Sequence, residues 1–97
     1  MAYEIVLAPE AVEDLRAPRA NVRTAVLRAL KTHLRDEPGK TSRSRIKRLR
    51  RLRRPQYRLR VGETRVFYDI TRSTVEIVAI VTESQAERWL RQFGDPV

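Results

Sequence analysis

Two stretches near the middle of the chain alternate apolar and polar side chains, which is the pattern of strands in a sheet. The stretches are residues 57–61 and 64–70, and only Gly62-Glu63 lies between them. A two-residue connection with glycine first is typical of a type II′ hairpin turn. A third strand is predicted at 75–81, because its nearly continuous apolar run suits a central strand that is covered on both sides.

The N-terminal third of the chain has other patterns. Residues 3–7 are apolar and partly β-branched, and they predict a short strand. Pro9 suits the first turn of a helix, and Pro18 ends that helix. From 19 to 35 apolar residues recur every four positions, which predicts a second helix with one buried stripe. Two helices separated by one proline are expected to form an antiparallel hairpin.

A last helix is predicted after residue 83. Ser84 is followed three residues later by Glu87, which is the capping-box pattern. This helix is expected to bury Ala86, Leu90 and Phe93.

These elements together predict an α+β fold: a small, mainly antiparallel sheet with an N-terminal helical hairpin and a C-terminal helix. A further short strand is possible near 46–49, and the helices are expected on one face of the sheet. A length of 97 residues fits a single domain, 1–97. No apolar run is long enough to span a membrane, and the first residues lack a signal-peptide pattern. A cytoplasmic location and no membrane partner are therefore expected.

The positive charge of the chain is concentrated in one segment. The chain has 21 Lys and Arg residues against 12 Asp and Glu, a formal net charge of +9. Residues 40–60 contain eleven of these basic residues, mostly arginine, and no acid. Such a patch repels itself, and a polyanion relieves the repulsion, although a solvated or disordered basic loop is the simpler alternative. The candidate nucleic-acid-binding residues are Lys47, Arg48, Arg50, Arg51, Arg53 and Arg54.

The two-residue turn also fixes which side chains of the hairpin share a face. On one face Arg60 lies opposite Arg65 and Arg58 lies opposite Phe67, while the apolar side chains of both strands take the other face. Like charges directly opposite each other are destabilising by up to about 1 kcal/mol. The three guanidinium groups are therefore expected to form a cradle for an anion. The alternative is that they spread into solvent or pair with Asp69 on the same face.

The residue inventory excludes several kinds of site. There is no cysteine, which excludes disulfides, thiolate metal sites and a cysteine nucleophile. The single histidine, His33, excludes a two-histidine metal site and falls within the pattern of the second helix, where a structural role is expected. No metal site is predicted.

The hairpin sequence resembles a known family. Residues 57–68 read YRLRVGETRVFY and resemble the signature hairpin of the RelE/ParE toxin superfamily, of general form Y-R-L-R-V-G-x-x-R-V-x-Y. Residues 46–49 resemble the short basic strand before that hairpin, and 78–90 resemble the last strand and C-terminal helix of RelE-like members. The resemblance covers nearly the whole chain and implies a RelE-like fold.

The resemblance also implies a function. It implies a toxin of a type II toxin–antitoxin system that cleaves mRNA in the ribosomal A site and is silenced by a cognate antitoxin. The catalytic basic residues of RelE-type toxins match Arg58, Arg60 and Arg65. In that chemistry a ribose 2′-OH attacks the adjacent phosphorus without a metal or other cofactor, and cationic donors stabilise the phosphorane oxygens. The implied partners are the antitoxin, the ribosome and mRNA.

Two departures from RelE keep other functions open. RelE has lysine at the positions of Arg58 and Arg60, whereas arginine stays charged and cannot transfer a proton. RelE also has an arginine and a tyrosine at the positions that match Ser84 and Leu90. A ParE-like inhibitor of DNA gyrase and a non-catalytic basic nucleic-acid-binding module therefore remain alternatives.

Overall fold

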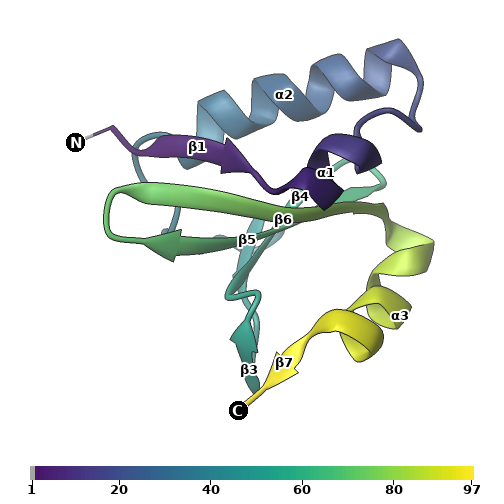
Figure 1. Ribbon diagram of the computed structural model, residues 1–97. Coiled ribbons are helices and arrows are strands. Elements are labelled where there is room, and N and C mark those ends of the chain that lie inside the picture. Colours follow the sequence, from purple (N-terminus) through teal and green to yellow (C-terminus); the bar gives the residue numbers. More distant parts are fainter. Residues whose placement is uncertain (1) are drawn as a thin grey trace.

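A five-stranded sheet forms the centre of the computed structural model, which describes residues 2–97 (Figure 1). In chain order the elements are β1 (Glu4–Leu7), α1 (Pro9–Asp14), α2 (Ala20–Leu34), β2 (Ile46–Arg48), β3 (Leu52–Arg54), β4 (Tyr57–Val61), β5 (Thr64–Thr71), β6 (Thr74–Thr82), α3 (Glu83–Phe93) and β7 (Asp95–Pro96). The strand order is β1-β6-β5-β4-β2, in which β1 pairs with β6 in parallel and the other pairs are antiparallel. β3 and β7 form a separate two-stranded ribbon. The predicted α+β class with a mainly antiparallel sheet is confirmed.

The register of the β4–β5 hairpin is the predicted one. Val61 pairs with Thr64, Arg60 with Arg65 and Arg58 with Phe67. Gly62 has a φ of 58°, and the φ of Glu63 is not positive. A positive φ at the first turn position alone is the conformation of a type II′ turn, and glycine reaches it without strain.

The hydrophobic core lies between α2 and one face of the sheet. From α2, Val26, Leu30 and Leu34 are fully or almost fully buried, at the four-residue spacing of the predicted stripe. The sheet contributes apolar side chains from every strand, among them Leu59, Val66, Tyr68, Val75 and Ile77. Burial of this face is therefore what places the arginines of the hairpin on the opposite one.

The last helix differs from its prediction in position and start. α3 packs against the opposite face of the sheet from α2, since the Trp89 ring stacks on Phe67 with their centroids 5.1 Å apart. The helix begins after Thr82 without a side-chain cap, so the expected capping box at Ser84 does not form. None of its residues is buried, and Phe93 is 59% exposed. The helices thus cover both faces, because β5 carries apolar side chains on both.

The N-terminal helices have the predicted order but unequal lengths. α1 has only six residues, and it is tied to the sheet where Asp14 accepts a hydrogen bond from the Ile80 amide at 2.8 Å. Arg23 on α2 bonds back to the carbonyls of Leu15 and Pro18, at 2.7 and 3.0 Å, and so closes the turn between the helices. Across residues 2–97 the helices are too short and too polar to cross a membrane.

Tyr68 is expected to contribute to stability through its hydroxyl group. The hydroxyl is buried and donates to the Pro38 carbonyl at 2.7 Å, and this burial raises the pKa of Tyr68. Tyr68→Phe should lower the free energy of unfolding by about 1–2 kcal/mol, because it leaves a buried carbonyl without a donor. Urea denaturation measures this loss. The control is Tyr57→Phe, which changes the stacked ring 5.5 Å away and should cost less than about 0.5 kcal/mol.

Candidate functional site

Four basic residues lie side by side on the sheet face opposite the core, and we call this set the cationic face: Lys47, Arg58, Arg60 and Arg65. Lys47 on β2 pairs with Arg58 on β4, and Arg60 pairs with Arg65 on β5. Directly paired residues point to the same side of a sheet, and so do residues two apart on a strand. The register therefore gathers cations from three strands, as the sequence predicted for the three arginines.

Arg58 is the least satisfied member of the cationic face. Its side chain is half-buried and donates to the Ser44 carbonyl at 3.2 Å, but its Nε is buried without any acceptor in the described chain. Burial, and then the charges of Arg65 and Arg60, lower the pKa of Arg58. A buried donor without an acceptor costs about 1–3 kcal/mol. An anion at this position would supply both the missing acceptor and the missing negative charge.

Arg65 is not the open side chain that the sequence predicted. It is only 6% exposed, and it donates to the carbonyls of Gly62 and Thr64 at 2.9 and 3.2 Å. It also forms an ion pair of 3.2 Å with Glu83, the first residue of α3. Arg60, its partner across the hairpin, is exposed. The cationic face is therefore open at Arg60 and closed by α3 at Arg65.

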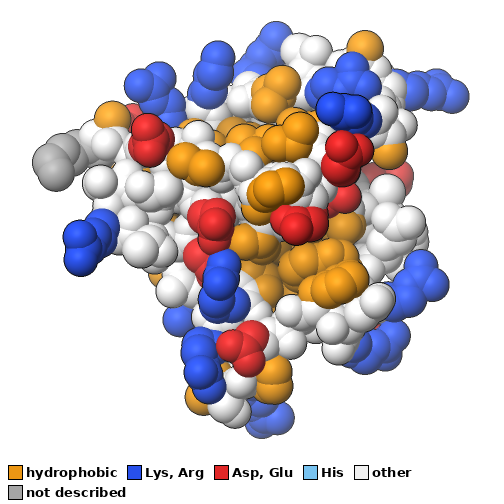
Figure 2. Space-filling view, in the orientation of Figure 1, with side chains coloured by type: hydrophobic (Ala, Val, Ile, Leu, Met, Phe, Trp, Pro, Cys, Tyr) orange, Lys and Arg blue, Asp and Glu red, His pale blue; other side chains and the backbone are white. Residues whose placement is uncertain are grey.

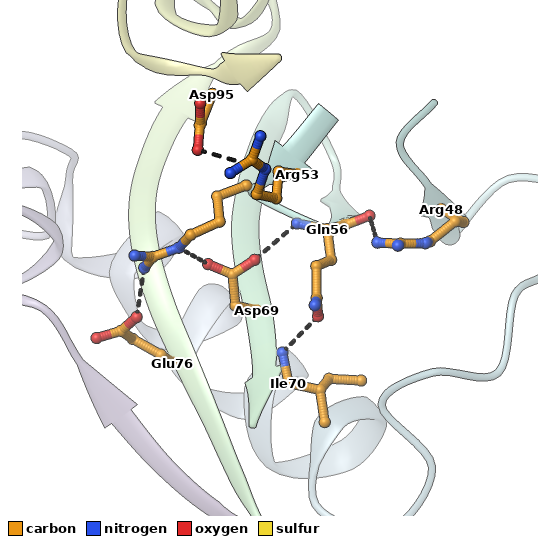
Figure 3. Close-up of polar contacts among 8 residues, drawn as sticks. Arg48, Arg53, Gln56, Asp69, Ile70, Glu76 and Asp95 are labelled. Carbon is orange, nitrogen blue, oxygen red and sulfur yellow. Dashed lines mark hydrogen bonds and ion pairs between the residues drawn. The ribbon is translucent and has the colours of Figure 1, made fainter. Parts of the chain in front are cut away.

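Part of the basic segment is neutralised within the molecule. Arg54 binds Asp69 at 2.9 Å and Glu76 at 2.8 Å, and the Gln56 amide donates to the other oxygen of Asp69 at 2.8 Å (Figure 3). We call these four residues the Asp69 cluster. Asp69 and Glu76 are direct cross-strand partners, so the guanidinium of Arg54 relieves the repulsion between them. The hydrogen bond to Asp69 and the charge of Asp69 raise the pKa of Arg54.

The remaining basic candidates fall into two groups. Arg53 lies 4.0 Å from Asp95, and Arg48 donates to the Gln56 carbonyl at 3.0 Å while its guanidinium lies over the Tyr57 ring. Lys47, Arg50 and Arg51 are exposed and have neither an ion pair nor a side-chain hydrogen bond within residues 2–97. The predicted run therefore offers an external anion fewer free cations than its sequence suggests.

Two acidic residues with defined partners were missed by the sequence analysis. Glu76 could have been found, because the antiparallel register after Arg72 places it opposite Asp69. Glu83 gave no such signal, since its contact with Arg65 depends on the angle at which α3 leaves β6. Trp89 packs on Phe67. Burial, and then the charge of Arg45, lower the pKa of His33. Neither observation gives Trp89 or His33 a catalytic role.

A groove of about 600 Å³ lies between α1, α3 and the ribbon of β3 and β7. Its walls include four acidic residues (Glu10, Asp14, Asp69 and Asp95) and one basic residue, Arg54, and its apolar surface includes Trp89. Figure 2 shows acidic side chains around an apolar centre on this side of the molecule, with basic side chains mostly toward the edges. A carboxylate-lined groove repels a polyanion. Within residues 2–97, no three His, Cys, Asp or Glu side chains are grouped so that they could hold a metal ion.

Comparison with known proteins identifies the class. Residues 5–87 match the family described as the ParE toxin of type II toxin–antitoxin systems. The match spans most of the chain, and the hairpin sequence and the sheet agree with it, so the molecule is a toxin of a type II toxin–antitoxin module. The chain belongs to this ParE toxin family, within the RelE/ParE superfamily. No curated protein sequence matches it significantly.

Solved structures show the same fold. The RelBE2 toxin–antitoxin complex from Mycobacterium tuberculosis matches with a TM-score of 0.72 and 25% identity, over 84% of this chain and 99% of that one. The free E. coli RelE toxin, solved as a mutant, matches with a TM-score of 0.61 and 18% identity, over 96% of this chain and 99% of that one. The RelE–RelB complex from Pyrococcus horikoshii matches with a TM-score of 0.63 and 18% identity, over 88% of this chain and 99% of that one. At such identities the last two show the fold alone.

Because of its contacts, Arg65 is expected to contribute to the stability of the fold. Arg65→Ala should lower the free energy of unfolding by about 1–3 kcal/mol, because it removes buried hydrogen bonds and leaves the start of α3 without its ion pair. Arg60→Ala, on the exposed partner, should change it by less than about 0.5 kcal/mol. Denaturation in urea checks both values. Equal values for the two variants would contradict the burial of Arg65.

Proposed function

We propose that this toxin is a ribosome-dependent endoribonuclease that cleaves mRNA, and that Arg58, Arg60 and Arg65 surround the scissile phosphate. The observation that carries the proposal is the unpaired Nε of Arg58, which is buried among cations. This burial, and then the charges of Arg65 and Arg60, lower the pKa of Arg58. Arginine suits this role because its planar group can bind two phosphate oxygens at once. A small turn of the side chain is needed to bring the buried nitrogen to a phosphate oxygen.

The proposed reaction uses the RNA's own nucleophile. The ribose 2′-hydroxyl gives its proton to a base, and its oxygen forms a bond to the adjacent phosphorus. The bond from phosphorus to the 5′-oxygen breaks, and the leaving 5′-oxygen takes up a proton from an acid, so the products are a 2′,3′-cyclic phosphate and a 5′-hydroxyl. Negative charge accumulates on the phosphorane oxygens, where guanidinium groups stabilise it. Arginine stays charged and accepts no proton, so the base and the acid lie outside these three residues. That division fits a protein that supplies charge while the ribosome holds the RNA in line.

Arg65 takes part through an exchange of partners. Its guanidinium is paired with Glu83 at 3.2 Å, and the side chain of Glu83 is largely exposed. A phosphate that enters beside Arg58 and Arg60 competes with Glu83 for this guanidinium. The carboxylate of Glu83 then turns toward water, which costs little for an exposed group.

A cognate antitoxin is the second proposed partner. The M. tuberculosis relative is a toxin–antitoxin complex. Acidic side chains of such a partner would meet Lys47, Arg58 and Arg60 and would compete directly with RNA, because charge complementarity determines which surfaces associate. The silencing of the toxin then needs no change of its fold.

Toxicity should depend on the exposed arginine of the cationic face. Arg60→Ala is expected to lower the rate of mRNA cleavage by about 10²–10³, the usual loss for one donor to a developing oxyanion, with the fold retained. Inducible expression followed by growth curves and primer extension on mRNA measures this. The matched control is Arg28→Ala, which removes the same charge from an exposed position on α2 and should remain toxic.

The same experiment separates the alternatives. Growth arrest by Arg60→Ala equal to that of the wild type would rule out the assigned site. Growth arrest by the wild type without new mRNA ends would rule out the nuclease and would favour inhibition of gyrase.

RNA binding should weaken steeply as salt rises. Five basic side chains of the cationic face and of residues 49–56 form no ion pair within residues 2–97: Lys47, Arg50, Arg51, Arg58 and Arg60. At about −0.7 per phosphate for single strands, these give a slope of log K against log salt of about −3.5. Fluorescence anisotropy with a single-stranded RNA over a salt series measures the slope. A slope near zero would contradict the electrostatic basis of the proposal.

A further inference from the structure

We infer that Asp69 is a positioning residue that holds residues 49–56 so that Arg50 and Arg51 bind the same RNA as the cationic face. The inference rests on the proposed function, since it assigns to that RNA a second set of contacts. Asp69 is acidic and only 4% exposed, so it touches no phosphate itself.

The contacts of Asp69 fix the segment on both sides of Pro55. One carboxylate oxygen accepts from Arg54 Nε at 2.9 Å, and the other accepts from the Gln56 amide at 2.8 Å (Figure 3). The side chain of Gln56 adds a third tie by accepting from the Ile70 amide at 2.9 Å. One buried carboxylate thus anchors the C-terminal end of the segment to β5.

The other end of the segment is held by the sheet. Lys47 and Arg48 pair with β4, and the Leu49 amide donates to the Gln56 carbonyl at 2.8 Å. The two ends therefore meet, and the residues between them form a closed loop. Arg50 and Arg51 lie in this loop with exposed side chains. A loop that is closed at its base presents these charges at a fixed place.

The base of this loop lies next to the cationic face. Asp69 lies two residues beyond Phe67 on β5, and Phe67 pairs with Arg58. Two residues along a strand span about 7 Å. A strand whose phosphate lies at Arg58 would therefore run past the base of the loop.

The direction in which neutralising Asp69 changes the RNA affinity distinguishes a positioning role from a purely electrostatic one. If Asp69 were only a negative charge near RNA, its neutralisation would strengthen binding, because the protein would gain one positive charge. If Asp69 positions the loop, its neutralisation should weaken binding, because the arginines would be held less firmly.

The test compares Asp69→Asn with Glu76→Gln in anisotropy titrations of a single-stranded RNA. Both variants remove one negative charge from a carboxylate that binds Arg54, but only the first disturbs the bond to the Gln56 amide. Asp69→Asn is expected to weaken binding roughly threefold to tenfold and to make the salt slope shallower by about 0.7 for each lost phosphate contact. Glu76→Gln should bind as tightly as the wild type or slightly more tightly. Equal or tighter binding by Asp69→Asn would overturn the inference.

A second variant and a second measurement keep the test decisive if Asp69→Asn does not fold, as judged by circular dichroism. Arg54→Lys keeps the net charge but loses the forked contact with both carboxylates, and it should weaken RNA binding in the same direction. Hydrogen exchange without RNA should be faster at residues 49–56 in either variant, with β5 and β6 unchanged. If the wild type binds no RNA, the proposed function fails, and unchanged exchange at 49–56 separately rejects the anchoring by Asp69.

Discussion

The register of the β4–β5 hairpin is the constraint on which the rest of the structure depends. Gly62 takes the positive φ that a two-residue turn requires, and every pair from Val61–Thr64 to Tyr57–Tyr68 follows from it. A shift by one residue would exchange the two faces and place arginine in the core. The burial of the apolar face under α2 and the gathering of Arg58, Arg60 and Arg65 on the opposite face are therefore consequences of one turn.

The charge that a partner meets differs from the charge that the sequence counts. The formal net charge is +9, yet Arg54 is held by two carboxylates and Arg65 by one. In each of the three pairs at least one side chain is largely exposed, but Asp69 and Arg65 are themselves buried. The molecule thus uses some of its arginines to hold segments in place and leaves others, such as Arg50, Arg51 and Arg60, without an ion pair within residues 2–97. The charge pattern of the sequence identifies the basic surface, and the ion pairs determine which of its residues have no acidic partner.

Local rules were enough to predict the hairpin, its faces and the stripe of α2, because alternation and turn length act over a few residues. The burial of Phe67 and Arg65 could not be predicted in this way, since it depends on α3 folding back across the sheet. The capping box at Ser84 was wrong because β6 continues to Thr82, which becomes the residue before the helix. The Asp69 cluster joins three separate segments of the chain. Its geometry, and the pairing of Arg54 with Asp69 and Glu76, therefore could not be predicted from the basic segment of the sequence.

The parallel pairing of β1 with β6 has a consequence for the order in which the molecule can form. Glu4 pairs with Thr74 and Leu7 with Ile77, whereas β4, β5 and β6 are joined by short turns. Contacts between distant segments form slowly and only after both segments exist. During synthesis the apolar stripe of α2 therefore lacks part of its sheet until β6 has left the ribosome. The sheet is therefore expected to be complete only after β6 has been made, later than the local β4–β5 hairpin that carries Arg58, Arg60 and Arg65.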